Sequence, residues 1–398
     1  MTTAYRRSVE PPTWRRLDWL LLACVVALCV LGSLLVWSAT ANRTYLVEDD
    51  PTAFLTRNAV NILIGSVLGV VVLVTDHRWL RVLAAVLYLG SLAGLLLIFV
   101  PGVGTTVNGS HSWLMIGGLS VQPAEFAKLG VIVGMALVLA ERAEGRLRDH
   151  LSDSDLVPAL MIAALPAVLI LLQPDLGTAM VLIAVVFGVL ALAGAPKRWL
   201  VGLVALGAAA VYVAISMGVL AQYQLLRFSA FTDPSLDPRG AGYNTIQARV
   251  AIGNGGVFGE GLFQGSQTQA GFVPEQHTDF VFTVAGEELG LVGAATIIVL
   301  FAVLLWRALR IARNAEDIFG RLAAVGVACW FGFQAFQNIG MCLGIMPVTG
   351  VPLPFVSYGG TSMFASLAAV GLLQNIHLRA VRRPGLGVVV RSQLLRSR

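Results

Sequence analysis

Long apolar runs separated by short polar segments recur along the whole chain. Ten of them are candidates to cross the roughly 30 Å hydrocarbon layer of a membrane, although the second, fourth, sixth and tenth are short for a span. Backbone groups in lipid must pair within their own segment, so each run predicts a helix. The ten runs are residues 17–37, 60–75, 80–99, 126–139, 156–172, 178–193, 199–220, 281–306, 319–339 and 362–376. The pattern predicts an all-α polytopic membrane protein.

The distribution of basic residues gives the orientation. If the N-terminus is cytoplasmic, ten spans place 21 of the 27 Lys and Arg residues inside and five outside, with Lys128 in a span. Such an excess of cytoplasmic positive charge is typical of membrane proteins. We therefore expect a cytoplasmic N-terminal tail (residues 1–16), a membrane domain (17–376) and a basic cytoplasmic tail (377–398).

Composition supports this class. The chain is 57% hydrophobic and only 12% charged, whereas soluble domains carry about 25% charged residues. The net charge of +5 is explained by the topology and by contact with anionic lipid, so no nucleic-acid partner is expected.

One connection is much longer than the others. Residues 221–280 separate the seventh and eighth spans on the outside, and a loop of this length is usually functional or disordered. Its many aromatic and aliphatic residues argue for a folded segment, its glycines for tight turns, and residues 244–252 for a short helix. We expect a large folded extracytoplasmic loop that lies against the membrane.

Asp279 stands where this loop meets the eighth span, and a carboxylate near membrane depth often marks a functional site. Partial burial near the like charges of Glu275, Glu287 and Glu288 would raise its pKa toward that of a useful general base. The alternative is a buried capping or paired carboxylate. His277, two residues earlier, is expected to orient the loop by hydrogen bonding, since two ligands do not make a metal site.

Three further charged residues gather at the outer ends of spans. Glu125 and Lys128 are spaced i, i+3 at the start of the fourth span and share one helix face. They predict a structural ion pair, or a lysine that faces a phosphate-bearing ligand. Asp175 precedes the sixth span, where a helix-capping carboxylate is the favoured interpretation and a ligand-facing role the second.

Five segments together resemble the SEDS family, the shape, elongation, division and sporulation proteins that polymerise peptidoglycan. They are residues 122–128 (QPAEFAK), 173–178 (QPDLGT), 274–280 (PEQHTDF), 286–290 (GEELG) and 352–360 (PLPFVSYGG). The form of residues 347–354 is more similar to the elongation (RodA-like) branch than to the division (FtsW-like) branch.

The resemblance implies a peptidoglycan glycosyltransferase that joins lipid II molecules into β-1,4 glycan strands and releases undecaprenyl pyrophosphate. It places the essential aspartate at Asp279 and the Glu and Lys of the fourth helix at Glu125 and Lys128. Family members commonly carry an Arg where this chain has Ser112. Arg227, Arg249, Lys128 or a divalent cation (Mg or Mn) are therefore the candidates for contacting pyrophosphate, and no organic cofactor is expected.

The remaining implied features concern the substrate and the surroundings. Asp175, His277 and Ser357 are further candidates for substrate binding. A class B penicillin-binding protein is the implied partner, and the cytoplasmic membrane the implied location. Two other functions stay open: a lipid II flippase, and a non-catalytic scaffold for the transpeptidase. A transporter would place its charges near the midplane, on broken helices in related halves, whereas these motifs gather at the outer mouth.

Overall fold

The computed structural model describes residues 13–43, 50–107, 110–116, 119–143, 153–218, 222–238 and 240–382. Residues 1–12 and 383–398, which belong to the two predicted cytoplasmic tails, lie outside the described residues.

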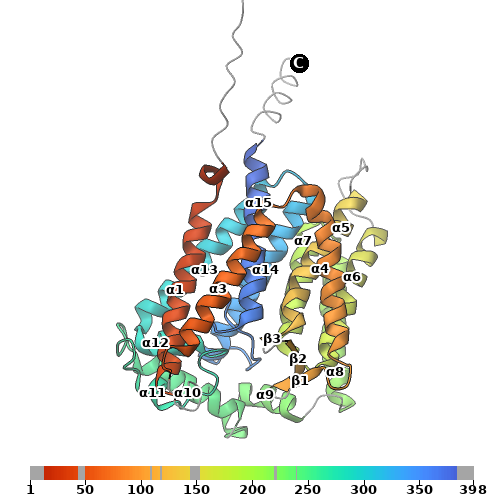
Figure 1. Cartoon of the computed structure of the whole chain (residues 1–398). Helices are drawn as coiled ribbons and strands as arrows, with labels where there is room; N and C mark the ends of the chain where they lie inside the picture. Colours follow the sequence, from red (N-terminus) through yellow and green to blue (C-terminus); the bar gives the residue numbers. More distant parts are fainter. Residues whose placement is uncertain are drawn as a thin grey trace, which may run out of the picture.

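Each predicted span overlaps one of ten long helices in the described part of the chain. The helices are α1 (Trp19–Ala41), α3 (Ala53–Val74), α4 (His77–Leu97), α5 (Pro123–Ala143), α6 (Asp153–Leu172), α7 (Leu176–Leu192), α8 (Lys197–Ser216), α13 (Gly290–Asn314), α14 (Ile318–Leu343) and α15 (Gly360–Arg382). Within the described ranges, seven are long and apolar enough to cross a membrane, namely α1, α3, α4, α5, α6, α13 and α14. The shorter α7 packs against α14, and α15 packs against α3, so both belong to the same bundle (Figure 1). The polytopic helical fold is confirmed.

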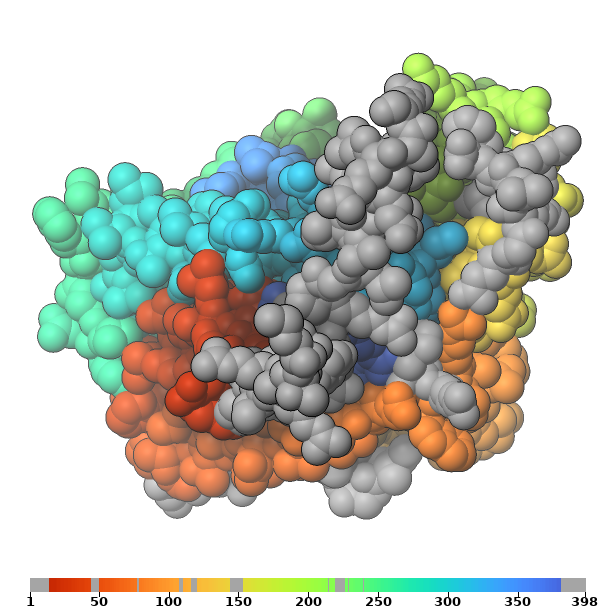
Figure 2. All heavy atoms as spheres, turned by 90° about the horizontal axis from the view of Figure 1, so that it is seen from above, coloured from red at the N-terminus to blue at the C-terminus, as the bar shows by residue number. Residues whose placement is uncertain are grey.

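The two ends of the bundle carry different elements. The 3₁₀ turn η1 (Thr13–Arg16) and the C-terminal end of α15 lie at one end (Figure 1). There Arg307 of α13 forms an ion pair with Asp18 at the start of α1, at 2.5 Å. Seen from this end, α1, α3 and α4 form one side of the molecule (Figure 2). We call the opposite end the outer end, because the predicted orientation places it outside the cytoplasm.

The predicted single span over residues 281–306 is wrong in one respect. It is two helices, α12 (Val281–Glu288) and α13, which meet at Leu289. Gly290 has φ +64, and a Cβ there would lie 2.3 Å from the backbone nitrogen of Gly259. The glycine-rich stretch of the outer loop therefore packs directly on the break, where Leu291 donates its backbone N–H to Gly256 at 3.0 Å. This close backbone approach interrupts a run that is apolar enough to be continuous.

The outer end carries all the remaining elements. The loop before α12 contains α9 (Gln222–Thr232), η2 (Pro234–Leu236), α10 (Ala241–Asn254) and α11 (Ser266–Ala270). The folded loop and its helix over residues 244–252 are thus confirmed. A small antiparallel sheet was not predicted. Its strands β1 (Gly104–Val107), β2 (Ser110–Ile116) and β3 (Leu119–Val121) follow the order β1-β2-β3.

Candidate active site

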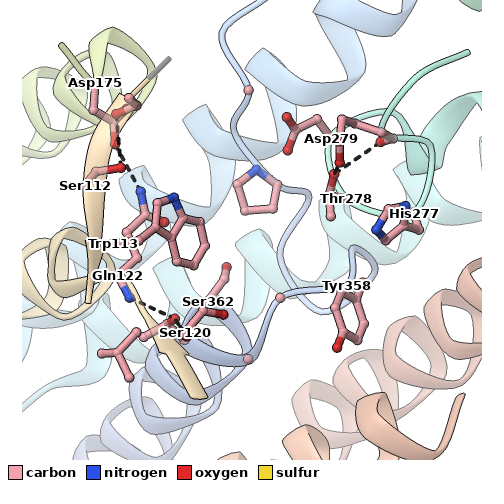
Figure 3. A pocket seen from close by; sticks show the side chains of 18 of the residues that line it. Ser112, Trp113, Ser120, Gln122, Asp175, His277, Thr278, Asp279, Tyr358 and Ser362 are labelled. Atoms are coloured by element: carbon pink, nitrogen blue, oxygen red, sulfur yellow. Dashed lines mark hydrogen bonds between the residues drawn. The ribbon is translucent and has the colours of Figure 1, made fainter. Parts of the chain in front are cut away.

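A cavity of about 770 Å³ opens at the outer end between the sheet, the starts of α3, α7 and α15, and the loops before α12 and α15. Figure 3 shows Asp175, Ser112, Trp113, Gln122 and Ser120 on one side, and His277, Thr278, Asp279 and Tyr358 on the other. Thr56, Arg57, Asn61, Arg227, Glu275, Thr349, Gly350 and Thr361 also line it. Most of the residues that line the cavity have polar side chains, and they include three carboxylates and two arginines.

Asp279 is held by a tight turn. The amides of Thr278, Asp279 and Phe280 all donate to the carbonyl of Glu275, at 3.2, 3.0 and 3.2 Å. Glu275 has φ +50, a left-handed conformation that is uncommon for a residue other than glycine. Such strain is retained only where the surroundings enforce it. The turn aims the Asp279 side chain into the cavity (Figure 3).

The end of α1 anchors this turn from behind. Arg43 donates to the side-chain oxygen of Gln276 and to the carbonyl of Val273, the latter at 3.3 Å. Gln276 is completely buried. The ring of His277 packs edge-on against Phe54 of α3, with ring centroids 5.1 Å apart.

Electrostatics make Asp279 suited to proton transfer near neutral pH. Burial, and then the like charge of Glu275, raise its pKa to about 7, although the guanidinium of Arg227 acts in the opposite direction. A carboxylate with this pKa is partly ionised at pH 7 and basic enough to take a proton. Asp175 adds a smaller raising effect on the pKa, whereas the expected contributions of Glu287 and Glu288 are not found.

His277 serves the turn through its backbone. Its carbonyl accepts the N–H of Tyr358 at 2.9 Å, which joins the turn to the loop before α15. This main-chain bond does not depend on the residue type, and the buried Nδ1 of the ring has no hydrogen-bond partner in the described part of the chain, so the orienting role of the His277 side chain stays a prediction. Burial lowers the pKa of the ring, so the imidazole is neutral at pH 7.

Asp175 faces Asp279 from the opposite wall (Figure 3). It is the N-cap of α7, where it accepts the N–H of Thr178 at 3.0 Å, and the predicted capping role is confirmed. Its other oxygen accepts from the side-chain amide of Gln122 at 3.1 Å. Burial raises the pKa of Asp175.

Two arginines supply the positive charge among the cavity-lining residues. Arg227 of α9 is one of the predicted candidates. Arg57 of α3 was missed, because sequence reasoning counted it only as an outer basic residue. Arg57 contacts the ring of Phe54, at 5.7 Å from its centroid, and lies close enough to Tyr358 to oppose the rise in pKa that burial causes in its hydroxyl. It therefore joins α3 to the segment 352–360 without leaving the cavity wall.

Lys128 and Glu125 lie inside the bundle rather than in the cavity wall. Lys128 Nζ is 2.7 Å from Glu125 Oε1, and the two side chains are 0% and 2% exposed. The predicted ion pair is confirmed. Lys128 also donates to Gln334 Oε1 at 2.8 Å. The phosphate contact predicted for Lys128 stays a prediction.

Arg249 and Ser357 likewise lie outside the cavity lining. Arg249 donates to the carbonyls of Leu343 and Gly344, at 3.2 and 2.9 Å, where α14 ends. Ser357 accepts the N–H of Leu353 at 2.8 Å and is buried. These contacts support structural roles, and the substrate contacts predicted for both side chains stay predictions.

The residues that line the cavity were partly visible in the sequence. Gln122 and Tyr358 stand inside segments that carry the family resemblance, although no role was predicted for them, and Trp113 follows Ser112, where family members commonly carry an Arg. Asn61 belongs to an apolar run and Thr56 precedes it, and the packing of α3 against α15 brings both to the cavity.

A metal held by the protein alone does not fit this site. Among the described residues, no group of three or more His, Cys, Asp or Glu side chains converges on one point. Asp279 and Asp175 stand on different walls (Figure 3). The side chains that line the cavity are therefore the groups on which a mechanism can be built.

The fold and the cavity define a multi-pass membrane protein with a polar, acid-containing site at its outer end. Residues 18–381 match the family model of FtsW, RodA and SpoVE, described as cell cycle proteins. The chain therefore belongs to this family, the SEDS proteins, and is a multi-pass protein of the cytoplasmic membrane.

Similar proteins cover nearly the whole chain. A probable peptidoglycan glycosyltransferase FtsW from Geobacter metallireducens is 36% identical over 93% of this chain and 96% of its own length. The stage V sporulation protein E of Bacillus subtilis is 36% identical over 90% of this chain and 96% of its own.

Two solved structures share the fold. The rod shape determining protein RodA of Thermus thermophilus is 34% identical, with a TM-score of 0.65 over 92% of this chain and 98% of that one. A chain from a peptidoglycan synthase complex that coordinates polymerization and crosslinking reaches a TM-score of 0.75 at 34% identity, over 92% of this chain and 98% of that one.

Proposed function

We propose that this protein is a peptidoglycan glycosyltransferase that joins lipid II into β-1,4 glycan strands at the outer face of the cytoplasmic membrane, with Asp279 as general base. The observation that carries the proposal is the Asp279 carboxylate, which faces a polar cavity of about 770 Å³ with a pKa of about 7. Both substrates carry long lipid tails, so an enzyme in the membrane reaches them where they reside.

In the proposed reaction, ionised Asp279 accepts the proton of the acceptor sugar's 4-hydroxyl. The hydroxyl oxygen then forms a bond to the donor's anomeric carbon, and the bond from that carbon to the pyrophosphate oxygen breaks. The leaving group departs as undecaprenyl pyrophosphate. General-base assistance of this kind is typically worth 10²–10⁴-fold in rate.

Arg57 and Arg227 are proposed to stabilise the charge on the departing pyrophosphate, since both line the cavity. They are proposed to supply the positive charge that an Arg at the position of Ser112 supplies in other family members. An involvement of Mg²⁺ or Mn²⁺ stays a prediction, which chelation of a lipid II reaction with EDTA tests, and no step above depends on it.

The experiment is polymerisation of purified lipid II by the purified full-length chain. Wild type is expected to form glycan strands, and Asp279→Asn to form at least about 10²-fold less. Asp233→Asn is the matched control, because Asp233 is exposed and caps η2 in the same outer loop. Near-normal product from Asp279→Asn would refute the role of Asp279.

Lipid II flipping is the second candidate function. The break between α12 and α13 is a feature that transporters also show. However, Glu287 at this break accepts hydrogen bonds from the backbone amides of α11, and its carboxylate does not line the cavity. Lipid II translocation without glycan product in sealed vesicles would favour the transporter.

The pathway and partner are part of the proposal. Residues 347–354 support a role in cell elongation, although relatives bear names from division, sporulation and rod shape. Expression of this chain in cells depleted of either the elongation protein or the division protein tests which of the two it can replace. A class B penicillin-binding protein is the proposed partner, in line with the synthase complex that shares the fold.

A further inference from the structure

Helix α14 presents three buried amide side chains on one face toward the outer loops. Gln334, Gln337 and Asn338 are spaced i, i+3 and i+4, and each is 0% exposed. Burying an amide is costly unless it is hydrogen-bonded, so three such side chains on one apolar helix require specific partners. All three find partners in the loop between α14 and α15, which we call the 347–352 loop.

Within the described residues, the first two amides hydrogen-bond the 347–352 loop but not the turn 275–280, and Gln337 also donates to Met180 Sδ of α7 at 3.7 Å. Gln334 donates to the carbonyl of Pro352 at 2.7 Å, while its oxygen accepts from Lys128 and from Trp330. Gln337 donates to Thr349 Oγ1 at 2.7 Å. The buried ion pair of α5 is therefore connected through Gln334 to the 347–352 loop.

Asn338 differs, because it bridges two segments. Its Nδ2 donates to the carbonyl of Asp279 at 2.7 Å and to the carbonyl of Val351 at 2.8 Å. These carbonyls belong to the turn 275–280 and to the 347–352 loop, both of which line the cavity. One amide group thus fixes the main chain of the proposed base against the opposing loop.

The two bridged segments also meet at the carboxylate itself. Gly350 has φ +72, and a Cβ at this position would lie 3.2 Å from Asp279 Oδ2. The 347–352 loop therefore packs directly against the Asp279 carboxylate and helps to keep water from it. A shift of this loop would change both the position and the hydration of Asp279.

We propose that Asn338 is a positioning residue, which ties the backbone of Asp279 to the 347–352 loop and sets the position of the carboxylate in the cavity. Gln334, together with Glu125 and Lys128, braces the other end of this loop. This inference rests on the proposed function only for its effect on the rate.

Hydrogen exchange of the purified full-length chain tests the bridge independently of activity. Asn338→Leu keeps the size of the side chain and removes the donor. The substitution is expected to speed hydrogen exchange of the backbone amides about tenfold in the turn 275–280 and in the 347–352 loop, because both segments lose the hydrogen bond from Asn338. Gln337→Leu is expected to speed this exchange in the 347–352 loop alone. If Asn338→Leu does not fold, Asn338→Ser is measured in the same way.

Asn375→Leu is the matched control. Asn375 is also a buried helical asparagine, and it donates to the carbonyls of Val72, Leu73 and Thr75 at the far end of the bundle. It should leave both outer segments unchanged. The proposal is overturned if Asn338→Leu changes neither segment, or if Asn375→Leu changes them equally.

A pH profile separates positioning from a general loss of folded protein. The groups that act electrostatically with Asp279 are Glu275 on its own turn, Arg227 on α9, Asp175 at the start of α7 and Cys342 on α14. Asn338→Leu leaves these groups in place but lets water reach the carboxylate. The expected result is at least a tenfold lower kcat and an acid limb moved to lower pH. An unchanged acid limb contradicts the proposal, whereas a wild type without glycan product refutes only the proposed function.

Discussion

Asp279 and Glu287 lie on the same chain segment, but their carboxylates meet opposite surroundings. Glu287 is fully buried at the end of α12 and accepts from the amides of Gln267 and Thr268, at 2.7 and 2.9 Å, and from the Thr268 hydroxyl at 2.6 Å. Its hydrogen-bonding capacity is used to hold α11. Asp279 instead faces the cavity, with its position fixed through its backbone.

This difference separates a structural acid from a reactive one. The carboxylate of Glu287 is surrounded by donors from α11, so its contacts tie α12 to α11. A carboxylate that is partly desolvated beside another acid holds its proton more tightly and can exchange it near pH 7. The comparison predicts that changes around Asp279 alter rate and pH dependence, whereas changes around Glu287 alter stability.

The largest expected effect comes from Arg227, one of the two arginines that line the cavity. Arg227→Gln removes a guanidinium that is proposed to stabilise the leaving group, and a donor of this kind is worth roughly 10²-fold in kcat. The substitution also raises the pKa of Asp279, because Arg227 lowers it, so the acid limb moves to higher pH. Initial rates of lipid II consumption across pH measure both. Arg198→Gln is the control outside the cavity lining, because Arg198 is an exposed arginine that pairs with Asp153, and equal losses in the two variants would remove Arg227 from the site.

The next effect concerns stability. Glu287→Gln places an amide against the donors of Gln267 and Thr268, so at least one buried donor loses its partner. We expect a loss of about 1–3 kcal/mol in unfolding free energy. Thermal unfolding in detergent measures it, with Asp279→Asn expected to unfold near the wild-type temperature. If Asp279→Asn were destabilised and Glu287→Gln were not, Asp279 rather than Glu287 would be the structural carboxylate, which would contradict the comparison.

The smallest effect is a shift of the pH profile. Glu275 raises the pKa of Asp279, so Glu275→Gln removes a like charge and lets the pKa fall. The base is then ionised at lower pH, and the acid limb of the rate moves down. Asp233→Asn in the same outer loop should leave the limb in place. A limb that stays fixed in Glu275→Gln would show that the two acids do not interact.

Features that depend on local spacing could be predicted from the sequence. The i, i+3 pair Glu125–Lys128, the capping Asp175 and the helices themselves follow from periods and from short motifs. The break at Leu289 could not be predicted, because it depends on backbone contact with Gly259, which is distant in sequence.

The residues that build the site could be predicted less well, because contacts between segments distant in sequence bring them together. Asn338 and Asp279 are 59 residues apart, and no local pattern relates them. Arg57 reaches the cavity only because α3 packs against α15. Conversely, Lys128 carries a charge that suggests a ligand, but in the structure it is bonded to Glu125 and Gln334 inside the bundle. Position in the packed bundle, rather than residue type, decides which charges line the cavity.

The most direct measurement is the pH dependence of glycan synthesis by the wild-type chain under single-turnover conditions. If the ionised carboxylate of Asp279 takes the proton, the rate rises with pH through a midpoint near 7, the value to which burial and Glu275 raise its pKa. The residual rate of Asp279→Asn should lack this rise. A rate that is flat between pH 5 and 8, or a rise that persists in Asp279→Asn, would contradict the account.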